Sequence, residues 1–106
     1  MTEIKEGNAN IYEDLAVSDP QEMRIKAQLA TKIAAIIEER QLTQTEAAKI
    51  IGITQPKLSG LLRGNFRGVS EAKMFDCLNR LGRDVTIVVG QARRTQGKGR
   101  LKVELS

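Results

Sequence analysis

The stretch that most constrains the fold of this 106-residue chain is residues 44–62, QTEAAKIIGITQPKLSGLL. Two short helices that meet at a wide angle over a turn of about three or four residues need a small residue where they approach and a glycine in the turn. Ala48 and Gly52 meet both needs. The second helix also needs aliphatic residues toward the core, and the sequence supplies Ile53, Leu58 and Leu61. This spacing predicts a pair of helices joined by a tight corner.

Both of these helices carry starting signals. Thr43 and Glu46 are spaced as a capping box, in which each side chain accepts a hydrogen bond from the backbone amide of the other residue. Thr54 is placed to cap the following helix, and Pro56 is tolerated in its first turn. Gly64 is expected to end that helix. The sequence therefore predicts helices that begin just after Thr43 and just after Thr54.

Longer helical patterns flank this pair. A helix is predicted from Pro20 to about Gln41, because apolar residues recur there at three- and four-residue spacing. The apolar residues of this helix are Leu29, Ala30, Ile33, Ala34, Ile36 and Ile37. A fourth helix is predicted from its cap, Ser70, through Leu81, with Gly82 ending it.

The two ends of the chain follow other patterns. Residues 1–19 show no persistent period and are interpreted as an N-terminal arm. After residue 82 the apolar period changes to two, over residues 85–89 and again over residues 101–105, which indicates two short strands. The sequence thus predicts an arm (1–19), a helical domain (20–82) and a β-strand dimerisation extension (83–106).

The helical pattern around residues 44–62 resembles the XRE family of phage-repressor and Cro-like regulators. The resemblance covers residues 25–82, about half of the chain. We therefore expect a mainly α fold, a four- to five-helix lambda-repressor-like helix-turn-helix domain with a short C-terminal β extension. The resemblance implies a sequence-specific, DNA-binding transcriptional regulator that acts as a repressor and takes double-stranded DNA as its partner.

The expected DNA contacts lie on the polar side of the third helix and beside it. Gln55 is placed to meet adenine N6 and N7 in the major groove, and Ser59 lies one turn further along. Lys57 is placed for a base edge or a phosphate, and Gln44 matches the family residue that clamps a backbone phosphate. The complete expected site is Gln44, Thr54, Gln55, Pro56, Lys57, Ser59, Arg63, Asn65 and Arg67, of which the last three lie in the following loop.

Two positions depart from the family pattern. Gly60 stands where several phage repressors carry a long base-reading side chain, and Pro56 replaces a residue that is often polar. Direct base readout is therefore expected to be sparse. DNA shape and backbone contacts are expected to carry more of the discrimination between sequences.

Charge is divided unevenly along the chain. Residues 1–42 contain 5 Lys or Arg and 8 Asp or Glu, whereas residues 43–106 contain 12 and 5. A localised cationic surface attracts a polyanion, which favours a nucleic acid as the partner of the second part.

Other residue types argue against several function classes. The chain has no histidine, and Cys77, which we expect in the core, is its single cysteine. These two facts exclude acid–base catalysis by histidine, nucleophiles of the Cys–His type and most transition-metal sites. We expect no enzyme activity, no metal and no cofactor. No apolar run approaches the length of a membrane span and the N-terminus lacks a signal-peptide pattern, so a cytoplasmic location is expected.

The predicted strands bear on assembly. A ribbon of two short strands is marginal by itself, whether its strands pair within one chain or between chains. Pairing with a second copy would bury Val85, Ile87 and Val89 and set two recognition helices on one side of a duplex, roughly 34 Å apart. We therefore expect a homodimer.

The layout of arm, helical domain and basic tail also looks like a subgroup of stand-alone XRE proteins that are often HigA-like antitoxins. Such a protein would neutralise a RelE/HigB-like ribonuclease toxin through its acidic first 42 residues and repress its own promoter; the arm could equally be a disordered tail tucked against the domain. Two rivals remain: a protein-binding adaptor with an XRE fold that does not bind DNA, and an RNA-cleaving enzyme of the small-toxin type. Lys57, Arg63 and Arg67 argue against the adaptor, and the helical pattern argues against a sheet-based enzyme.

Overall fold

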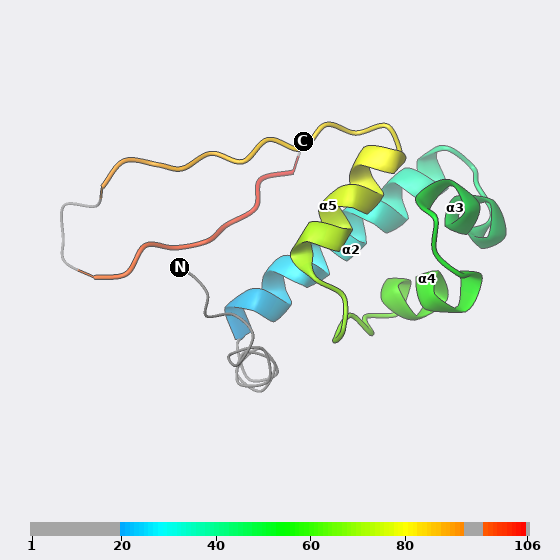
Figure 1. Cartoon of the computed structure of the whole chain (residues 1–106), viewed down its shortest axis with the longest axis horizontal. Helices are drawn as coiled ribbons and strands as arrows, with labels where there is room; N and C mark the ends of the chain where they lie inside the picture. The colour runs from blue at the N-terminus through cyan, green and yellow to red at the C-terminus, as the bar shows by residue number, and fades with distance from the viewer. Residues whose placement is uncertain (1–19, 93–96, 106) are drawn as a thin grey trace.

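The helices of the protein assemble around one long element. The computed structural model describes residues 20–92 and 97–105, so the predicted arm lies outside the described residues. Within them the chain forms α2 (Pro20–Glu39), α3 (Gln44–Ile51), α4 (Gln55–Leu62) and α5 (Glu71–Arg80). Helices α2 and α5 lie side by side, and α3 and α4 pack against each other and against this pair (Figure 1). The predicted mainly helical architecture is confirmed.

The capping residues set where α3, α4 and α5 begin. The Glu46 amide donates to Thr43 Oγ1 at 3.0 Å, and the Thr43 amide donates to Glu46 Oε1 at 2.8 Å, which completes the predicted capping box. The hydroxyls of Thr54 and Ser70 each accept the amide three residues later, at 3.3 and 3.0 Å. These bonds satisfy amides that the first turn of a helix otherwise leaves without partners.

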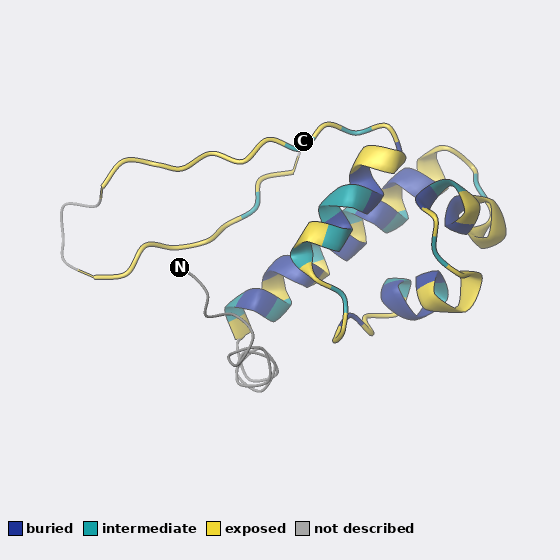
Figure 2. Ribbon diagram, viewed as in Figure 1, coloured by how far each residue is buried: buried dark blue, intermediate teal, exposed yellow. Residues whose placement is uncertain are grey.

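The core is aliphatic and is shared by all four described helices. Figure 2 shows the buried side of α2 turned toward α5. Ala34, at the margin of the apolar face of α2, is only half-buried. Burial raises the pKa of the Cys77 thiol, which agrees with the core position predicted for it. The largest fully buried side chains are Ile33, Ile36, Ile51, Leu58, Leu61, Met74 and Cys77.

Each described helix ends in the same backbone motif. A residue with positive φ follows the helix, and the next amide donates to the carbonyl five residues before it, as Leu42 does to Ile37 at 3.0 Å. This pattern satisfies carbonyls that the last turn leaves open. The residue with positive φ is glycine at 52, 64 and 82, but at the end of α2 it is Gln41, with φ of 56°. Helix α2 therefore stops near the predicted position through a strained non-glycine residue.

The C-terminal extension differs from the expectation. Residues 85–89 and 101–105 were expected as strands, but no strand is formed in the described residues. Both segments are extended chain, the first leading away from the helices and the second returning toward them (Figure 1). Half-buried Val85 and Val103 pack against the core, and Gln21 Nε2 donates to the Leu101 carbonyl at 3.0 Å. Two short segments without further strands gain too little from pairing to form a stable ribbon in a single chain.

Replacing Gln41 with glycine tests the strain at the end of α2. A side chain in the left-handed region costs about 1 kcal/mol, and the extra freedom of glycine in the unfolded chain offsets part of this gain. We expect Gln41→Gly to raise the free energy of unfolding by about 0.5 kcal/mol, measured by urea denaturation. Gln41→Ala keeps a Cβ at the same φ and is the matched control, expected to bring no such gain. Equal stability of the two variants would contradict the assignment of strain to this residue.

Candidate nucleic-acid interface

The corner between α3 and α4 is built as the sequence predicts. Gly52 has φ of 86°, and its amide donates to the Ala48 carbonyl at 2.7 Å. Ala48 is buried, so the two helices approach closely there. Leu58 and Leu61 are buried on the inner side of α4, while Ile53 is half-buried. The polar side of α4 is consequently turned toward solvent.

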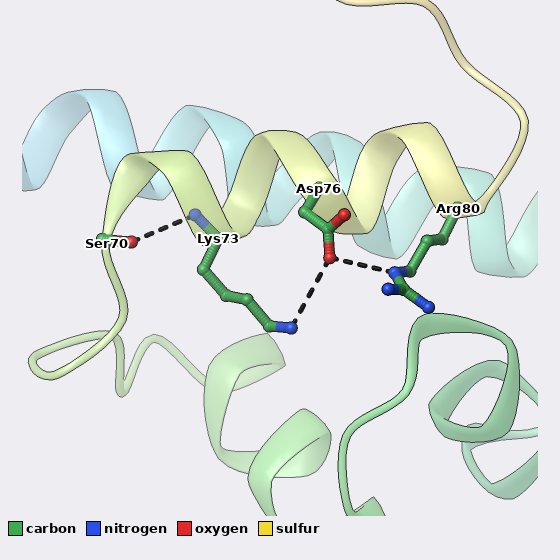
Figure 3. Close-up of polar contacts among 4 residues, drawn as sticks. All are labelled: Ser70, Lys73, Asp76 and Arg80. Carbon is green, nitrogen blue, oxygen red and sulfur yellow. Dashed lines mark hydrogen bonds and ion pairs between the residues drawn. The ribbon is translucent and has the colours of Figure 1, made fainter.

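Helix α5 packs on this corner through an arginine that the sequence analysis did not single out. Arg80 Nε donates to Asp76 Oδ2 at 3.0 Å, and Lys73 Nζ lies 3.6 Å from the same oxygen (Figure 3). A Cβ at Gly52 would lie 3.4 Å from Arg80 Nη1, so the guanidinium rests against the turn. Asp76 thereby holds one cation that contacts the corner and a second one earlier on α5.

The first residues of α3 and α4 are joined by their side chains. Gln55 Nε2 donates to Gln44 Oε1 at 2.8 Å, and both residues are exposed. No other hydrogen bond is formed by these two amides within the described part of the chain. Gln44 therefore keeps both N–H groups of its side chain, and Gln55 keeps its carbonyl oxygen and one N–H, all available to a ligand outside the protein.

The other polar residues of α4 are placed in different ways. Thr54 is exposed, but its hydroxyl serves as the cap of α4. Ser59 is half-buried, and its Oγ accepts a hydrogen bond from Arg63 Nη1. Lys57 is exposed and forms no ion pair with any described residue. Among these residues, Lys57 is the one that presents a charge without an ion-pair partner among the described residues on the outer side of the helix.

A hollow of about 320 Å³ lies between α4 and the loop that follows it. Gly60 is buried, and the side chain of Asn65 lies over it. Position 60, which the resemblance marks as the place of a base-reading side chain, is therefore covered by the loop and does not project outward. The hollow is lined by Pro56, Lys57, Gly60, Asn65, Arg67, Gly68 and Val69.

The surface around α3 and α4 is positively charged. Residues 44–69 contain one carboxylate, that of Glu46, and its Oε1 accepts the Thr43 amide in the capping box. None of the cations of this segment forms an ion pair with another residue in the described ranges. Such a surface attracts an anionic partner over a distance of about one Debye length. The cations are Lys49, Lys57, Arg63 and Arg67, all of them exposed.

The structure sorts the expected site residues into groups. Gln44 and Gln55 meet across the corner, and Ser59 meets Arg63. The hollow brings together Pro56, Lys57, Asn65 and Arg67, while Thr54 stands apart as a cap. Two features were not predicted from the sequence, namely the contact of Arg80 with the turn and the buried position of Gly60. A glycine inside an otherwise regular helix was the available signal for the second.

Other kinds of site find no support in the described part of the chain. No group of three or more His, Cys, Asp or Glu is placed there to hold a metal ion. None of the described helices is long and apolar enough to cross a membrane.

Comparison with known proteins gives a consistent result. A family model described as a helix-turn-helix domain matches residues 11–90. A solved structure that carries the name XRE family transcriptional regulator is similar to the chain, with 34% sequence identity and a TM-score of 0.74. The similarity covers 81% of this chain and 97% of that chain. No curated protein matches the chain significantly in sequence.

Proposed function

This chain belongs to the XRE family of helix-turn-helix regulators, and from that premise we propose that it represses transcription by binding a specific DNA sequence as a homodimer. The observation that carries the proposal is the hydrogen bond between Gln55 Nε2 and Gln44 Oε1. It ties the first residues of α3 and α4 together on the exposed side of the corner. Two helix N-termini are thereby held in one place, where their partial positive charges favour a phosphate.

The orientation of the two amides suits them to different parts of a duplex. Gln44 is left with N–H donors, which match the acceptor oxygens of a backbone phosphate. Gln55 is left with a carbonyl oxygen and one N–H, which match adenine N6–H and N7 in the major groove. The opposite orientation would place the Gln44 oxygen toward the phosphate and repel it. The bond therefore supports a division of roles between backbone clamping and base reading.

The charge of the same surface favours DNA over an adaptor role. The exposed cations of residues 44–69 remain unpaired within the described chain, and an interface with another protein usually depletes lysine at its core. A duplex, in contrast, releases counterions when cations approach its phosphates.

Variants of Gln55 and Arg63 compare base reading by Gln55 with a charge contact by Arg63 to the DNA backbone, on a duplex selected by the wild-type protein from a random-sequence pool. We expect Gln55→Ala to reduce discrimination at one base pair by about 1–3 kcal/mol, because it removes a bidentate base contact. We expect Arg63→Met to weaken all duplexes alike and to lower the slope of log K against log salt concentration by about one. Binding is measured by fluorescence anisotropy across a salt series.

The control for these variants is Arg24→Met, which removes an exposed cation from α2. It is expected to leave both sequence preference and salt slope close to those of the wild type. If Gln55→Ala and Arg63→Met change binding in the same way, the assigned roles are wrong. If the wild type selects no DNA sequence from the pool, the proposed regulator function is wrong and the protein-binding adaptor function replaces it.

The homodimer is supported by the C-terminal extension. Ile87 and Val89 are 71% and 91% exposed in the single chain, on a segment whose backbone is extended and unpaired in strands. Exposed apolar extended chain is a template for pairing with another strand. We propose that the same segment of a second copy pairs with it, which would form the sheet that one chain alone does not form and cover these side chains.

Introducing charge at this segment tests the dimer without disturbing the helical core. We expect the double variant Ile87→Asp and Val89→Asp to be a monomer of unchanged helicity that binds the selected duplex at least tenfold more weakly, since two linked half-site contacts become one. Light scattering gives the mass. Thr86→Asp with Gly90→Asp adds the same charge at alternate positions and is expected to remain dimeric. An unchanged dimer mass for the first variant would contradict the proposal.

A second candidate function, capture of a basic RelE/HigB-like toxin, is supported by the charge of the N-terminal segment. Residues 1–19 contain one Lys and five Asp or Glu, whereas α2 contains three basic and three acidic residues. The acidic excess of the first 42 residues therefore lies entirely in residues 1–19. We propose residues 1–19 as the segment that would bind a cationic protein.

Neutralising the acidic residues of this segment tests toxin capture independently of DNA binding. We expect the full chain with its acidic side chains at 3, 6, 13, 14 and 19 changed to amides to lose affinity for the product of the adjacent reading frame, because the opposite charge is gone. The selected duplex should bind as before or more tightly. Pull-down at low and moderate salt measures the first effect. Equal capture by both chains would rule out a charge-based partner.

A further inference from the structure

Arg80 is the one side chain in the described ranges that covers the open side of the turn between α3 and α4. A Cβ at Gly52 would point toward its guanidinium, at 3.4 Å from Nη1 and 3.9 Å from Cζ. No other described atom outside the two neighbouring residues would come within 4 Å of that Cβ. Because Gly52 has no side chain, the guanidinium lies directly over the backbone of the turn. The α5 arginine therefore contacts the residue at which the chain changes direction.

Asp76 determines where this guanidinium lies. Arg80 Nε donates to Asp76 Oδ2 at 3.0 Å, and Arg80 forms no other hydrogen bond or ion pair with a described side chain. A guanidinium is planar and rigid, so this one bond at Nε also fixes the direction of Nη1 and Nη2. Lys73 Nζ lies 3.6 Å from the same oxygen, on the other side of the carboxylate (Figure 3). Asp76 therefore holds two cations, of which Arg80 is the one that reaches the turn.

The ion pair of Arg80 and Asp76 contributes little to the stability of the fold. The two side chains are 53% and 42% exposed, and ion pairs so open to solvent add little to the free energy of unfolding. Helix α5 is held against α2 and α3 by its buried apolar side chains. What the ion pair adds is a local restraint on Gly52, which stands three positions before Gln55.

We propose that Arg80 is a positioning residue for DNA recognition. Held by Asp76, its guanidinium limits how far α4 can tilt about the Gly52 turn and so keeps Gln55 aligned with its base pair. The proposal rests on the proposed DNA binding and adds to it a residue of α5 that does not itself touch the duplex. A base contact made of two hydrogen bonds tolerates little misalignment, because hydrogen bonds weaken steeply once they are bent. Loss of the restraint therefore lowers discrimination between base pairs more than it lowers the affinity for DNA in general.

Arg80→Met tests the proposal, because methionine keeps an unbranched side chain and removes the guanidinium. The readout is the ratio of affinities for the selected duplex and for the same duplex changed at the base pair where Gln55→Ala loses discrimination. We expect Arg80→Met to lower this ratio roughly two- to fivefold, the range that corresponds to one exposed ion pair. The salt slope and the Tm are expected to stay close to those of the wild type, because no phosphate contact and no buried contact is lost. Lys73→Met removes the other cation of Asp76 from the same helix and is the matched control, expected to keep the ratio.

Asp76→Asn gives a second, independent measurement, and it decides if Arg80→Met does not fold. It weakens the hold on the guanidinium and is expected to lower the ratio as Arg80→Met does, while the double variant loses no more than either single one. An unchanged ratio, or equal loss in Lys73→Met, would overturn the positioning role. A salt slope lowered by about one in Arg80→Met would also overturn it, since Arg80 would then contact a phosphate directly. These outcomes leave the regulator intact, whereas a wild type that selects no duplex would overturn the regulator itself.

Discussion

The close approach of α3 and α4 at Gly52 is the constraint on which the rest of the structure depends. The left-handed backbone at this residue turns the chain within one step, and buried Ala48 allows the helices to touch. A larger residue at Ala48 would push the two helices apart, and a side chain at Gly52 would be strained by the left-handed φ and would meet the Arg80 guanidinium. The hydrogen bond between Gln44 and Gln55 exists only because this corner brings together side chains that stand eleven positions apart.

The surrounding helices hold the corner in place from the other side. Leu58 and Leu61 pack α4 against the core that α2 and α5 share. The guanidinium of Arg80 lies against the turn and is held there by its ion pair with Asp76. The outer side of α4 is thereby presented by a rigid support, which is what recognition of a rigid duplex requires. Because residues 44–69 carry four exposed cations and the single carboxylate of Glu46, the positive potential of this surface is not cancelled locally.

Sequence reasoning succeeded where the structure depends on residues close together in the chain. The capping box of Thr43 and Glu46 and the turn at Gly52 are local patterns, and both are present as predicted. It failed where the outcome depends on tertiary position. The burial of Gly60 follows from a loop that folds back over α4, which no periodicity reveals. Gln41 gives no sign of a left-handed conformation in sequence, because where α2 must stop depends on tertiary packing, in which α2 lies against α4 and α5.

The extended C-terminal segment, residues 85–105, bears on how the chain assembles. An alternating pattern specifies which side chains share one face of a strand, but it does not supply the neighbouring strand that makes the ladder. In the single chain Val85 and Val103 are held by the helical core, whereas Ile87 and Val89 between them remain exposed. The core thus anchors both ends of a segment whose middle lacks a partner. The partner that we propose for it is a second copy, since each chain would offer the other the same unpaired edge.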